Sequence, residues 1–239
     1  MAHDRWKPIE RELRRTAGPL IAGVDEVVRG PLAGPVVACA VVMPPDVRAI
    51  AGVDDSKKLT AQARTRLAIK IHQRAVSIGV GAASVREIDR INIYQATVLA
   101  MRRALARLTV APNHVLVDGK PFRTLDVPHT AIVGGDDVCY SIACASIIAK
   151  VTRDRVMHAL AVRYPNYLWE RNVGYSTLAH LQGLLAHGAT PHHRRSFMPV
   201  GQLSLDLTGS ATPAVDLAAF EAALEPRLVL DEDPDFMGD

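Results

Sequence analysis

Acidic residues stand at the ends of three apolar segments of this 239-residue chain. LIAGV is followed by Asp25 and Glu26, HVLV by Asp118, and TAIVGG by Asp136 and Asp137. At a single site such a residue is more often a turn former, because Asp and Gly favour the bends that follow strands. Three strand ends on one edge of a shared sheet would instead gather several carboxylates, and such a cluster repels itself unless it binds cations.

The ligand types in this cluster favour hard divalent ions. Carboxylate oxygens without accompanying histidine or cysteine spacing suit Mg²⁺ or Mn²⁺ better than Zn²⁺. Four carboxylates would balance the charge of two such ions. Two ions roughly 4 Å apart activate a water and stabilise the departing oxygen in phosphodiester displacement, so the protein need not supply a nucleophile of its own. These residues therefore predict metal-dependent hydrolysis.

Asp25 and Glu26 are neighbours in the chain, which sets a geometric condition. Adjacent side chains of a regular strand point to opposite faces of the sheet. Both carboxylates can serve one metal pair only if the strand is distorted or ends there. Gly23 before them and Arg29-Gly30-Pro31 after them are compatible with such an ending.

The predicted site needs a sheet, and the sequence predicts one. Short, apolar, Val-rich segments bounded by turn residues are typical of strands. The predicted strands are 20–26, 35–43, 76–85, 114–120 and 129–137. Consecutive strands followed by strands that alternate with helices indicate a mixed α/β sheet flanked by helices.

Helical spacing of apolar residues predicts the elements that flank this sheet. The predicted helices are 60–75, 84–105, 141–164, 176–188 and 216–225. Ser84 with Glu87 forms a capping box at the start of the second helix. Pro165 is expected to end the third helix, and Ser176 is the expected N-cap of the fourth.

Charge divides the chain into two unequal parts. The net charge is +3, but residues 215–239 hold eight acidic side chains against Arg227 alone, so the preceding 214 residues carry a net charge of +10. Such a body attracts a polyanion, although a well-solvated surface is the common alternative. No apolar stretch is long enough to span a bilayer, and the charged start lacks a secretory segment, so no membrane association and a cytoplasmic location are expected.

Cysteine and histidine do not predict a transition-metal site. Cys39, Cys139 and Cys144 form no C-x-x-C pair and are interpreted as small core residues. Three histidines lie near two arginines at 187–195, but their spacing fits no common zinc pattern.

Several motifs, taken together and in order, resemble ribonuclease HII, the type 2 ribonuclease H of bacteria. The motifs are VDEVVRGPLAGPVV, DDSKKL, VLVDG, GGDDVCYSIACASIIAKVTRDR, NVGYST and HRRSF. They extend from about Leu20 to Val200. The resemblance implies a ribonuclease H-like α/β catalytic domain over 18–165, a small helical substrate-binding region over 166–225, and flexible termini at 1–17 and 226–239.

The resemblance also implies an activity. The family cuts RNA within RNA/DNA hybrids and nicks DNA on the 5′ side of an embedded ribonucleotide, leaving a 5′-phosphate. The implied cofactors are two divalent ions, Mg²⁺ or Mn²⁺, and the implied partners are RNA/DNA hybrids and duplex DNA that contains ribonucleotides. The chain is expected to act as a monomer.

Four acids of this chain match the family's catalytic, metal-binding carboxylates. They are Asp25 and Glu26 in the DE motif, Asp118 in VDG and Asp136 in GGD. Asp137 is the nearby competitor of Asp136. Asp136 is preferred because it stands ten residues before the serine of ASIIAK, as the family's acid does.

Other positions match residues that contact substrate in the family. Val28-Arg29-Gly30 stands where the family has G-R-G, whose backbone touches the ribose 2′-hydroxyl. Tyr175 matches a tyrosine that packs on the sugar, although a core aromatic is the plain alternative. Lys57 and Lys150 match basic positions near the nucleic-acid backbone, where a solvated side chain is the alternative.

Two valines depart from the family pattern. Val173 replaces a frequent lysine, and Val28 replaces a glycine that permits close sugar approach and unusual dihedral angles. A hybrid-binding protein of the same fold, with cleavage impaired by Val28, is therefore one alternative to the enzyme. A metal-dependent phosphohydrolase of small nucleotides, without a preference for duplexes, is another.

We expect Val28→Gly to raise nicking at a lone ribonucleotide. If position 28 needs a positive φ, valine there adds strain of about 1–3 kcal/mol, which glycine removes. The measurement is the nicking rate on duplex DNA with one ribonucleotide. An unchanged rate in the variant would refute the idea.

Overall fold

The computed structural model describes residues 6, 8–27, 29–45 and 48–202. Within them lies one sheet of five strands, β1 (Ile21–Val27), β2 (Val36–Val42), β3 (Ser77–Ala83), β4 (His114–Asp118) and β5 (His129–Ile132). Their order in the sheet is β3-β2-β1-β4-β5. The pairs β1–β2 and β2–β3 are antiparallel, and β1–β4 and β4–β5 are parallel. The predicted mixed sheet and the presence of all five strands are confirmed. The last strand is shorter than predicted: it ends at Ile132, and Asp136 and Asp137 lie in a short helix, α4 (Gly135–Val138), rather than at a strand end.

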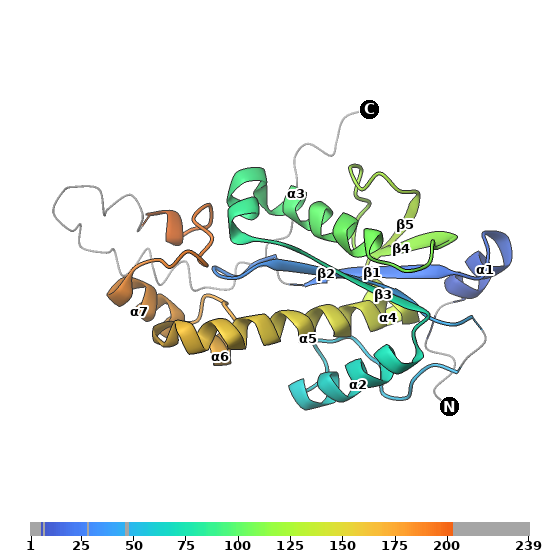
Figure 1. The fold of residues 1–239 in the computed structure, drawn as a ribbon, viewed down its shortest axis with the longest axis horizontal. Coiled ribbons are helices and arrows are strands. Elements are labelled where there is room, and N and C mark those ends of the chain that lie inside the picture. The colour runs from blue at the N-terminus through green and yellow to red at the C-terminus, as the bar shows by residue number, and fades with distance from the viewer. Residues whose placement is uncertain (1–5, 7, 28, 46–47, 203–239) are drawn as a thin grey trace.

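Helices cover both faces of the sheet (Figure 1). On one face, Val24, Ala38 and other residues of the same parity pack against α3 (Val85–Ala106). On the other face, Val27, Cys39 and Val41 pack against α2 (Ala61–Arg74) and the long helix α5 (Tyr140–Arg163). β1 and β2 are buried on both faces, which explains why their sequences are almost continuously apolar.

The helix predicted over 84–105 is broken near its middle. Ser84 and Glu87 form the predicted capping box at its start. Asn92, however, has φ 65° and ψ 168°, and its side-chain oxygen accepts a hydrogen bond of 3.0 Å from the backbone N–H of Gln95. Asn92 therefore caps a second helical segment, which asparagine allows because it tolerates positive φ better than most residues.

Short helices complete the C-terminal part of the described chain. They are α4 (Gly135–Val138), the 3₁₀ helix η1 (Pro165–Tyr167), α6 (Trp169–Asn172) and α7 (Leu178–His187). The N-cap of α7 is Thr177, whose hydroxyl accepts from the backbone N–H of His180, so the prediction of Ser176 is wrong by one residue. The helix predicted over 216–225 lies outside the described residues.

Residues 9–16 form a helix within the segment that was expected to be a flexible terminus. In α1 (Ile9–Thr16), Glu10 is buried, and its Oε1 accepts from the backbone N–H and the hydroxyl of Ser141 at 2.8 and 2.9 Å. Ser141 is the second residue of α5, so this carboxylate satisfies a free N–H at the helix start and complements the helix dipole. The expected domain boundaries themselves stay a prediction.

We expect Glu10→Ala to lower the free energy of unfolding by about 2 kcal/mol, because Ser141 loses a buried, charged acceptor. Urea denaturation followed by circular dichroism measures the change. Glu12→Ala is the matched control: Glu12 is exposed and pairs with Arg15, so its loss should change the stability by less than about 0.5 kcal/mol. Equal losses in the two variants would contradict the capping role.

Candidate active site

Three neighbouring segments of the fold carry the four predicted acids. Asp25 and Glu26 lie near the end of β1, and Asp118 is the last residue of β4. The parallel pairing of β1 with β4 ends at Val24 opposite Val117, so Asp25 and Asp118 follow side by side at the same edge. Asp136 lies in α4, between β5 and α5. The described structure thus brings the four predicted acids to one edge of the sheet.

Electrostatics show that these carboxylates act on one another. The pKa of Asp25 is raised well above its usual value, first by burial and then by the charges of Glu26, Asp118 and Asp136. The pKa of Glu26 is raised to about 7 by burial and Asp118, while Arg29 opposes the rise. Burial and the charge of Asp118 also raise the pKa of Asp136, against the opposing effect of Lys57. The cluster is a site of concentrated negative charge that is costly to keep ionised.

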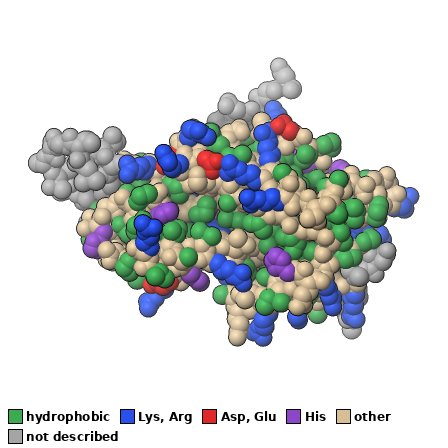
Figure 2. Space-filling model, in the orientation of Figure 1, with side chains coloured by type: hydrophobic (Ala, Val, Ile, Leu, Met, Phe, Trp, Pro, Cys, Tyr) green, Lys and Arg blue, Asp and Glu red, His purple; other side chains and the backbone are tan. Residues whose placement is uncertain are grey.

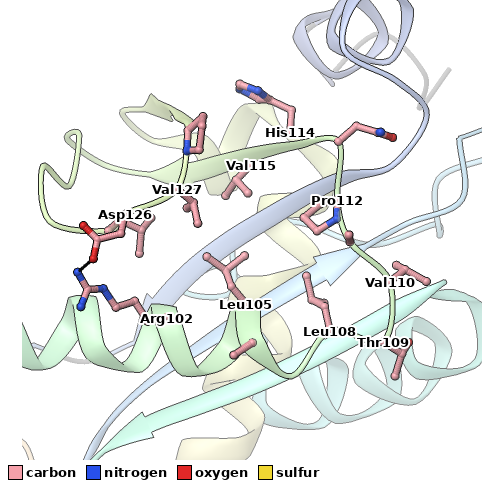
Figure 3. Close-up of a pocket in the computed structure, with 15 residues that line it drawn as sticks. Arg102, Leu105, Leu108, Thr109, Val110, Pro112, His114, Val115, Asp126 and Val127 are labelled. Atoms are coloured by element: carbon pink, nitrogen blue, oxygen red, sulfur yellow. Dashed lines mark hydrogen bonds and ion pairs between the residues drawn. The ribbon is translucent and has the colours of Figure 1, made fainter.

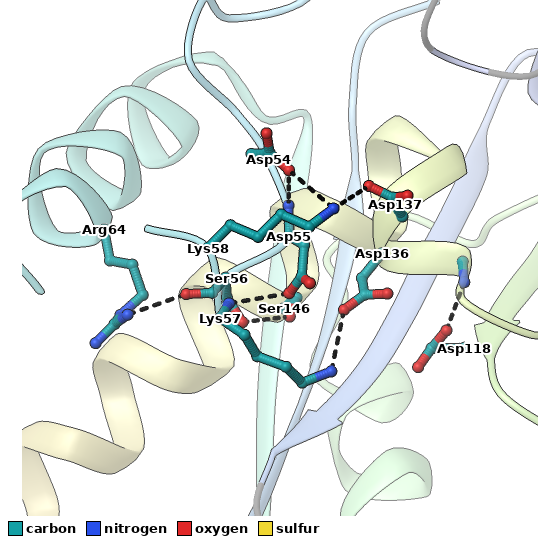
Figure 4. A network of polar contacts seen from close by, with 11 residues as sticks. Asp54, Asp55, Ser56, Lys57, Lys58, Arg64, Asp118, Asp136, Asp137 and Ser146 are labelled. Carbon is teal, nitrogen blue, oxygen red and sulfur yellow. Dashed lines mark hydrogen bonds and ion pairs between the residues drawn. The ribbon is translucent and has the colours of Figure 1, made fainter. Parts of the chain in front are cut away.

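Three of these acids are held by donors from the protein itself, and Figure 4 shows the contacts of Asp118 and Asp136. Asp118 Oδ1 accepts from the backbone N–H of Gly135 at 2.6 Å, and Asp136 Oδ2 is 3.4 Å from the Lys57 ammonium. Asp25 is hydrogen-bonded by Ser146 on α5. These contacts fix the orientation of three carboxylates.

Asp136 and Asp137 have different environments. Asp136 is buried and faces Lys57 and Asp118. The Asp137 side chain, which follows Asp136 in α4, is half exposed and pairs with Lys58 at 2.8 Å (Figure 4). The geometry therefore associates Asp136, rather than Asp137, with the other acids.

Asp25 and Glu26 lie in a regular part of β1, which ends one residue later at Val27, so the strand is not distorted between them. The register places Asp25 opposite Cys39 and Glu26 opposite Ala38, which belong to the cores on opposite faces, so the regular alternation holds. The charges of Asp118 and Lys57 nevertheless shift the pKa of Glu26, because this residue lies one position before β1 ends. Its Oε2 atom is buried and has no hydrogen-bond partner among the described residues.

A buried carboxylate oxygen without a donor is a natural ligand for a cation, so this residue set fits a hard divalent ion. The set does not form a finished cage. No three His, Cys, Asp or Glu side chains within the described ranges converge closely enough to enclose an ion. Mutual repulsion and the protein donors at Asp25, Asp118 and Asp136 account for this spacing.

The predicted substrate-contacting residues lie in three different settings. Tyr175 is 45% exposed and is therefore not a core aromatic. Gly30 is exposed, and a Cβ atom built on it would meet nothing within 4 Å. The Lys57 side chain is 80% exposed, whereas Lys150 forms an ion pair of 2.7 Å with Asp154 on the same helix. Val28 lies outside the described residues.

Val173 and the three cysteines are also placed by the structure. Val173 has φ 43°, a left-handed conformation that is strained for a β-branched residue. Cys39, Cys139 and Cys144 are buried in the core, as the sequence predicted, and form no disulfide.

Buried imidazoles form a network beside α7. His193 Nδ1 accepts from the backbone N–H of Thr190, so its proton is on Nε2, which lies 3.0 Å from His180 Nε2. His180 Nε2 also accepts from the Trp169 indole, and its Nδ1–H donates to the carbonyl of Tyr175. Burial lowers the pKa of both histidines, to about 3 for His193. The pair is neutral and holds the backbone of Tyr175.

A cavity of about 700 Å³ lies away from the acids (Figure 3). It is mostly apolar and is lined by the end of α3, by His114 and Val115 at the start of β4, and by the loop before β5. Asp118 stands at the opposite end of β4. This cavity is therefore not part of the acidic site.

Comparisons with known proteins agree with this fold. A family model for ribonuclease HII matches residues 22–200. A ribonuclease HII of Gluconobacter oxydans is 56% identical over 192 residues, which cover 79% of this chain and 92% of that protein. A crystal structure of ribonuclease H2 from Pyrococcus horikoshii matches with a TM-score of 0.66 and 26% identity, over 78% of this chain and 97% of that one. A crystal structure of Bst-RNase HIII in complex with Mn²⁺ matches with a TM-score of 0.61 and 21% identity, over 80% of this chain and 71% of that one.

The fold is thus the ribonuclease H-like α/β fold, as the sequence predicted, and the molecule is a nuclease of the ribonuclease H class. The chain belongs to the ribonuclease HII family. It is a metal-dependent hydrolase that degrades RNA in RNA/DNA hybrids. Among the described residues, no helix has the length and apolar character needed to cross a membrane.

Two residues that shape the site have no individual signal in the sequence. Ser146 and Ser56 are both buried, and their hydroxyl oxygens are 2.9 Å apart. Since Ser146 also bonds Asp25, the loop that carries Lys57 is tied to the carboxylate of β1. The only available signal was the occurrence of both serines within the family motifs.

We expect Glu26→Gln to stabilise the metal-free protein at pH 8. The folded state holds the Glu26 proton more tightly than the unfolded state, so this residue's stabilising contribution is present below pH 4.5 and is lost as the pH rises through about 7. The corresponding gain in the variant at pH 8 is up to about 3 kcal/mol. Thermal unfolding in a chelator at pH 5 and pH 8 measures it.

Added Mn²⁺ should raise the melting temperature of the wild type more than that of Glu26→Gln, because binding to the folded state stabilises it. Glu170→Gln, which removes an exposed carboxylate on α6, is the control and should behave as wild type at both pH values. A Glu26→Gln variant that is no more stable than wild type at pH 8 would show that the fold does not raise the pKa of Glu26.

Proposed function

We propose that this ribonuclease HII nicks duplex DNA on the 5′ side of an embedded ribonucleotide, as well as cutting RNA in hybrids. In the proposed reaction water attacks the phosphorus, the P–O3′ bond breaks, and the O3′ oxygen takes up a proton. The products are a 3′-hydroxyl and a 5′-phosphate. The observation that supports the proposal most strongly is the acidic cluster, in which one Glu26 oxygen has no hydrogen-bond partner among the described residues, beside an exposed turn and an exposed tyrosine.

We assign Asp25, Glu26, Asp118 and Asp136 as the catalytic carboxylates and as ligands for two divalent ions, Mg²⁺ or Mn²⁺. Such a pair supplies activation of the attacking water and neutralisation of charge on the departing oxygen. The protein's own part is to hold the carboxylates ionised and oriented. Ser146 orients Asp25, the Gly135 N–H orients Asp118, and Lys57 counters the charge of Asp136.

Recognition of the ribonucleotide is assigned to the Val28-Arg29-Gly30 turn and Tyr175. The open space over Gly30 admits a sugar close to the backbone, where a 2′-hydroxyl can hydrogen-bond and so distinguish RNA from DNA. The exposed Tyr175 ring offers an apolar surface for the neighbouring sugar. Two sides of the ribonucleotide are thus read by different segments.

Phosphate contacts are assigned to basic side chains. Lys57 is exposed beside Asp136, and the pKa of its ammonium is raised by Asp136 and Asp55 although burial opposes the rise, so it stays charged. Lys150 can contact phosphate only by sharing or leaving its pair with Asp154. The face shown in Figure 2 carries many Lys and Arg side chains and few Asp and Glu, which suits a polyanion. We further expect the chain to act as a monomer in the cytoplasm.

The test is incubation of end-labelled duplex DNA that contains one ribonucleotide, with Mg²⁺, Mn²⁺ or a chelator. We expect a nick on the 5′ side of the ribonucleotide, only with metal, and a product whose 5′ end can be ligated. Asp118→Asn should lower the rate by at least about 10²–10³-fold. Its amide oxygen can still accept from the Gly135 N–H, so the fold is kept.

Two pairs of variants sharpen this test. Asp126→Asn, on the surface near the distant cavity, should leave the rate unchanged. Asp136→Asn should lower it far more than Asp137→Asn, because only Asp136 faces the other acids. Metal-dependent nicking that survives in Asp118→Asn, or a reversed order of the Asp136 and Asp137 effects, would refute the assignment.

A further inference from the structure

Two arginine side chains are completely buried in the part of the chain that the structure describes. Arg153 of α5 and Arg194, which follows α7, are both 0% exposed. Arginine is almost never fully buried unless its charge is paired. Arg153 forms no ion pair with any carboxylate of the described residues. The burial of Arg153 therefore needs a reason other than the stability of an ordinary salt bridge.

Arg153 joins two segments that are far apart in the chain. Its Nε and one terminal nitrogen donate to the carbonyls of Pro35 at 3.2 Å and Ala33 at 2.9 Å. Its other terminal nitrogen donates to the carbonyl of Val173 at 2.7 Å. One planar guanidinium thus holds the turn before β2 and the segment that leads to Tyr175.

Arg194 holds the other end of the same turn. It donates to the carbonyl of Arg29 at 2.6 Å and to that of Gly34 at 2.9 Å. Its backbone N–H donates to Leu32, while the N–H of Leu32 donates to the carbonyl of Gly174. The turn at 29–35 is therefore bound on one side to residues 173–174 and on the other to Arg194.

The two segments approach as closely as backbones allow. Gly174 has φ 90°, and a Cβ atom on it would lie 2.6 Å from the carbonyl oxygen of Ala33. Gly34 has φ 87°, and a Cβ atom on it would lie 2.3 Å from the sulfur of Met157. Only the flat, five-donor guanidinium group reaches several carbonyls in so little space. Lysine, a point donor on a flexible stem, would not replace it fully.

Tyr175 lies next to this arrangement. Its phenol is within electrostatic reach of both guanidinium groups. Burial lowers the pKa of Arg153 to about 10 and that of Arg194 to about 9, and the charge of Arg153 contributes to the latter shift. Both groups remain charged at neutral pH. Two like charges are thus buried where the turn and Tyr175 meet. Their burial and mutual repulsion lower the stability of the fold, so their presence there points to a functional role.

We propose that Arg153 and Arg194 are positioning residues for ribonucleotide recognition, which hold the Arg29-Gly30 turn and Tyr175 at a fixed separation without touching the substrate. The proposal rests on the assignment of that turn and Tyr175 to the ribonucleotide. Under this proposal, recognition of the sugar depends on two buried side chains.

The test compares Arg194→Met and Arg153→Met with matched controls. Methionine keeps much of the side-chain length but donates no hydrogen bond. The controls are Arg195→Met and Arg155→Met, which remove exposed arginines next to Arg194 and on the same helix as Arg153. Arg194→Lys is included as the milder variant, because it retains the charge and can serve only part of the carbonyl set.

The first readout is amide hydrogen exchange, which needs no activity. In Arg194→Met and Arg153→Met we expect exchange at residues 29–34 and 174–175 to accelerate together, by at least roughly tenfold, with Arg194→Lys intermediate and both controls unchanged. The second readout is the thermal shift produced by Mn²⁺. It should stay as in wild type, because the acids lie outside the altered segments.

The third readout is kcat/KM for nicking at a lone ribonucleotide. We expect a loss of about 100-fold in the two methionine variants and partial rescue in Arg194→Lys. Unchanged exchange in a folded methionine variant would overturn the proposal, as would altered exchange with unchanged kcat/KM. If the methionine variants fail to fold, Arg194→Lys decides by the same two measurements. A wild type that does not nick refutes the proposed function instead. The exchange measurement still tests whether Arg153 and Arg194 hold the turn and Tyr175 in place.

Discussion

The mutual repulsion of buried carboxylates is the constraint on which this structure depends. Asp25 is surrounded by three other acids, and burial and their charges both favour its neutral form. A fold can tolerate such a cluster only by supplying donors at defined places or by binding cations. The Ser146 hydroxyl, the Gly135 N–H and the Lys57 ammonium are such donors, and each comes from a different element. The acids of β1, β4 and α4 and the Ser146 donor of α5 must therefore be arranged together.

Close packing sets where these donors stand. A Cβ atom on Gly23, two residues before Asp25, would lie 2.2 Å from the backbone of Ser141, so α5 crosses β1 as closely as a glycine allows. Glu10 caps the start of the same helix. The helix start is therefore held from both sides, and Ser146, just over one turn further along α5, is held where it meets Asp25.

The sequence predicts the sheet well, and it also locates the acids that the fold brings together, because strands and the acids near their ends are both visible in local sequence. Val-rich strands between turns, and acids at strand ends, are visible without knowledge of the partners. What it could not give are contacts between distant residues. The break at Asn92 sits inside a continuous helical pattern, and only the backbone angles reveal it. The pairing of Ser56 with Ser146, 90 residues apart, has no signature in either segment.

Which side chains are buried is also hard to predict from the sequence, as two pairs of residues show. Asp136 and Asp137 are adjacent and of the same type, so only the spacing of a family motif separates them in the sequence. In the structure, α4 turns Asp136 inward and leaves Asp137 to pair with Lys58. The burial of Arg153 and Arg194 has no signal in the local sequence, because Arg residues are usually exposed. Their carbonyl partners belong to loops, and loop positions relative to one another are set by tertiary packing rather than by local pattern.

One helix connects the two halves of the proposed reaction. Ser146 contacts Asp25, and Arg153, seven residues later, contacts the turn at 33–35. Seven residues are two helical turns, so both side chains lie on one face of α5, about 10 Å apart along its axis. β1 makes the second connection, since Asp25 and Glu26 precede the Arg29-Gly30 turn in the chain. Under the proposed function, the distance between the broken bond and the recognised sugar is fixed by these two rigid elements. A cut at one defined side of a ribonucleotide requires such a fixed distance, and it does not require any contact with the bases.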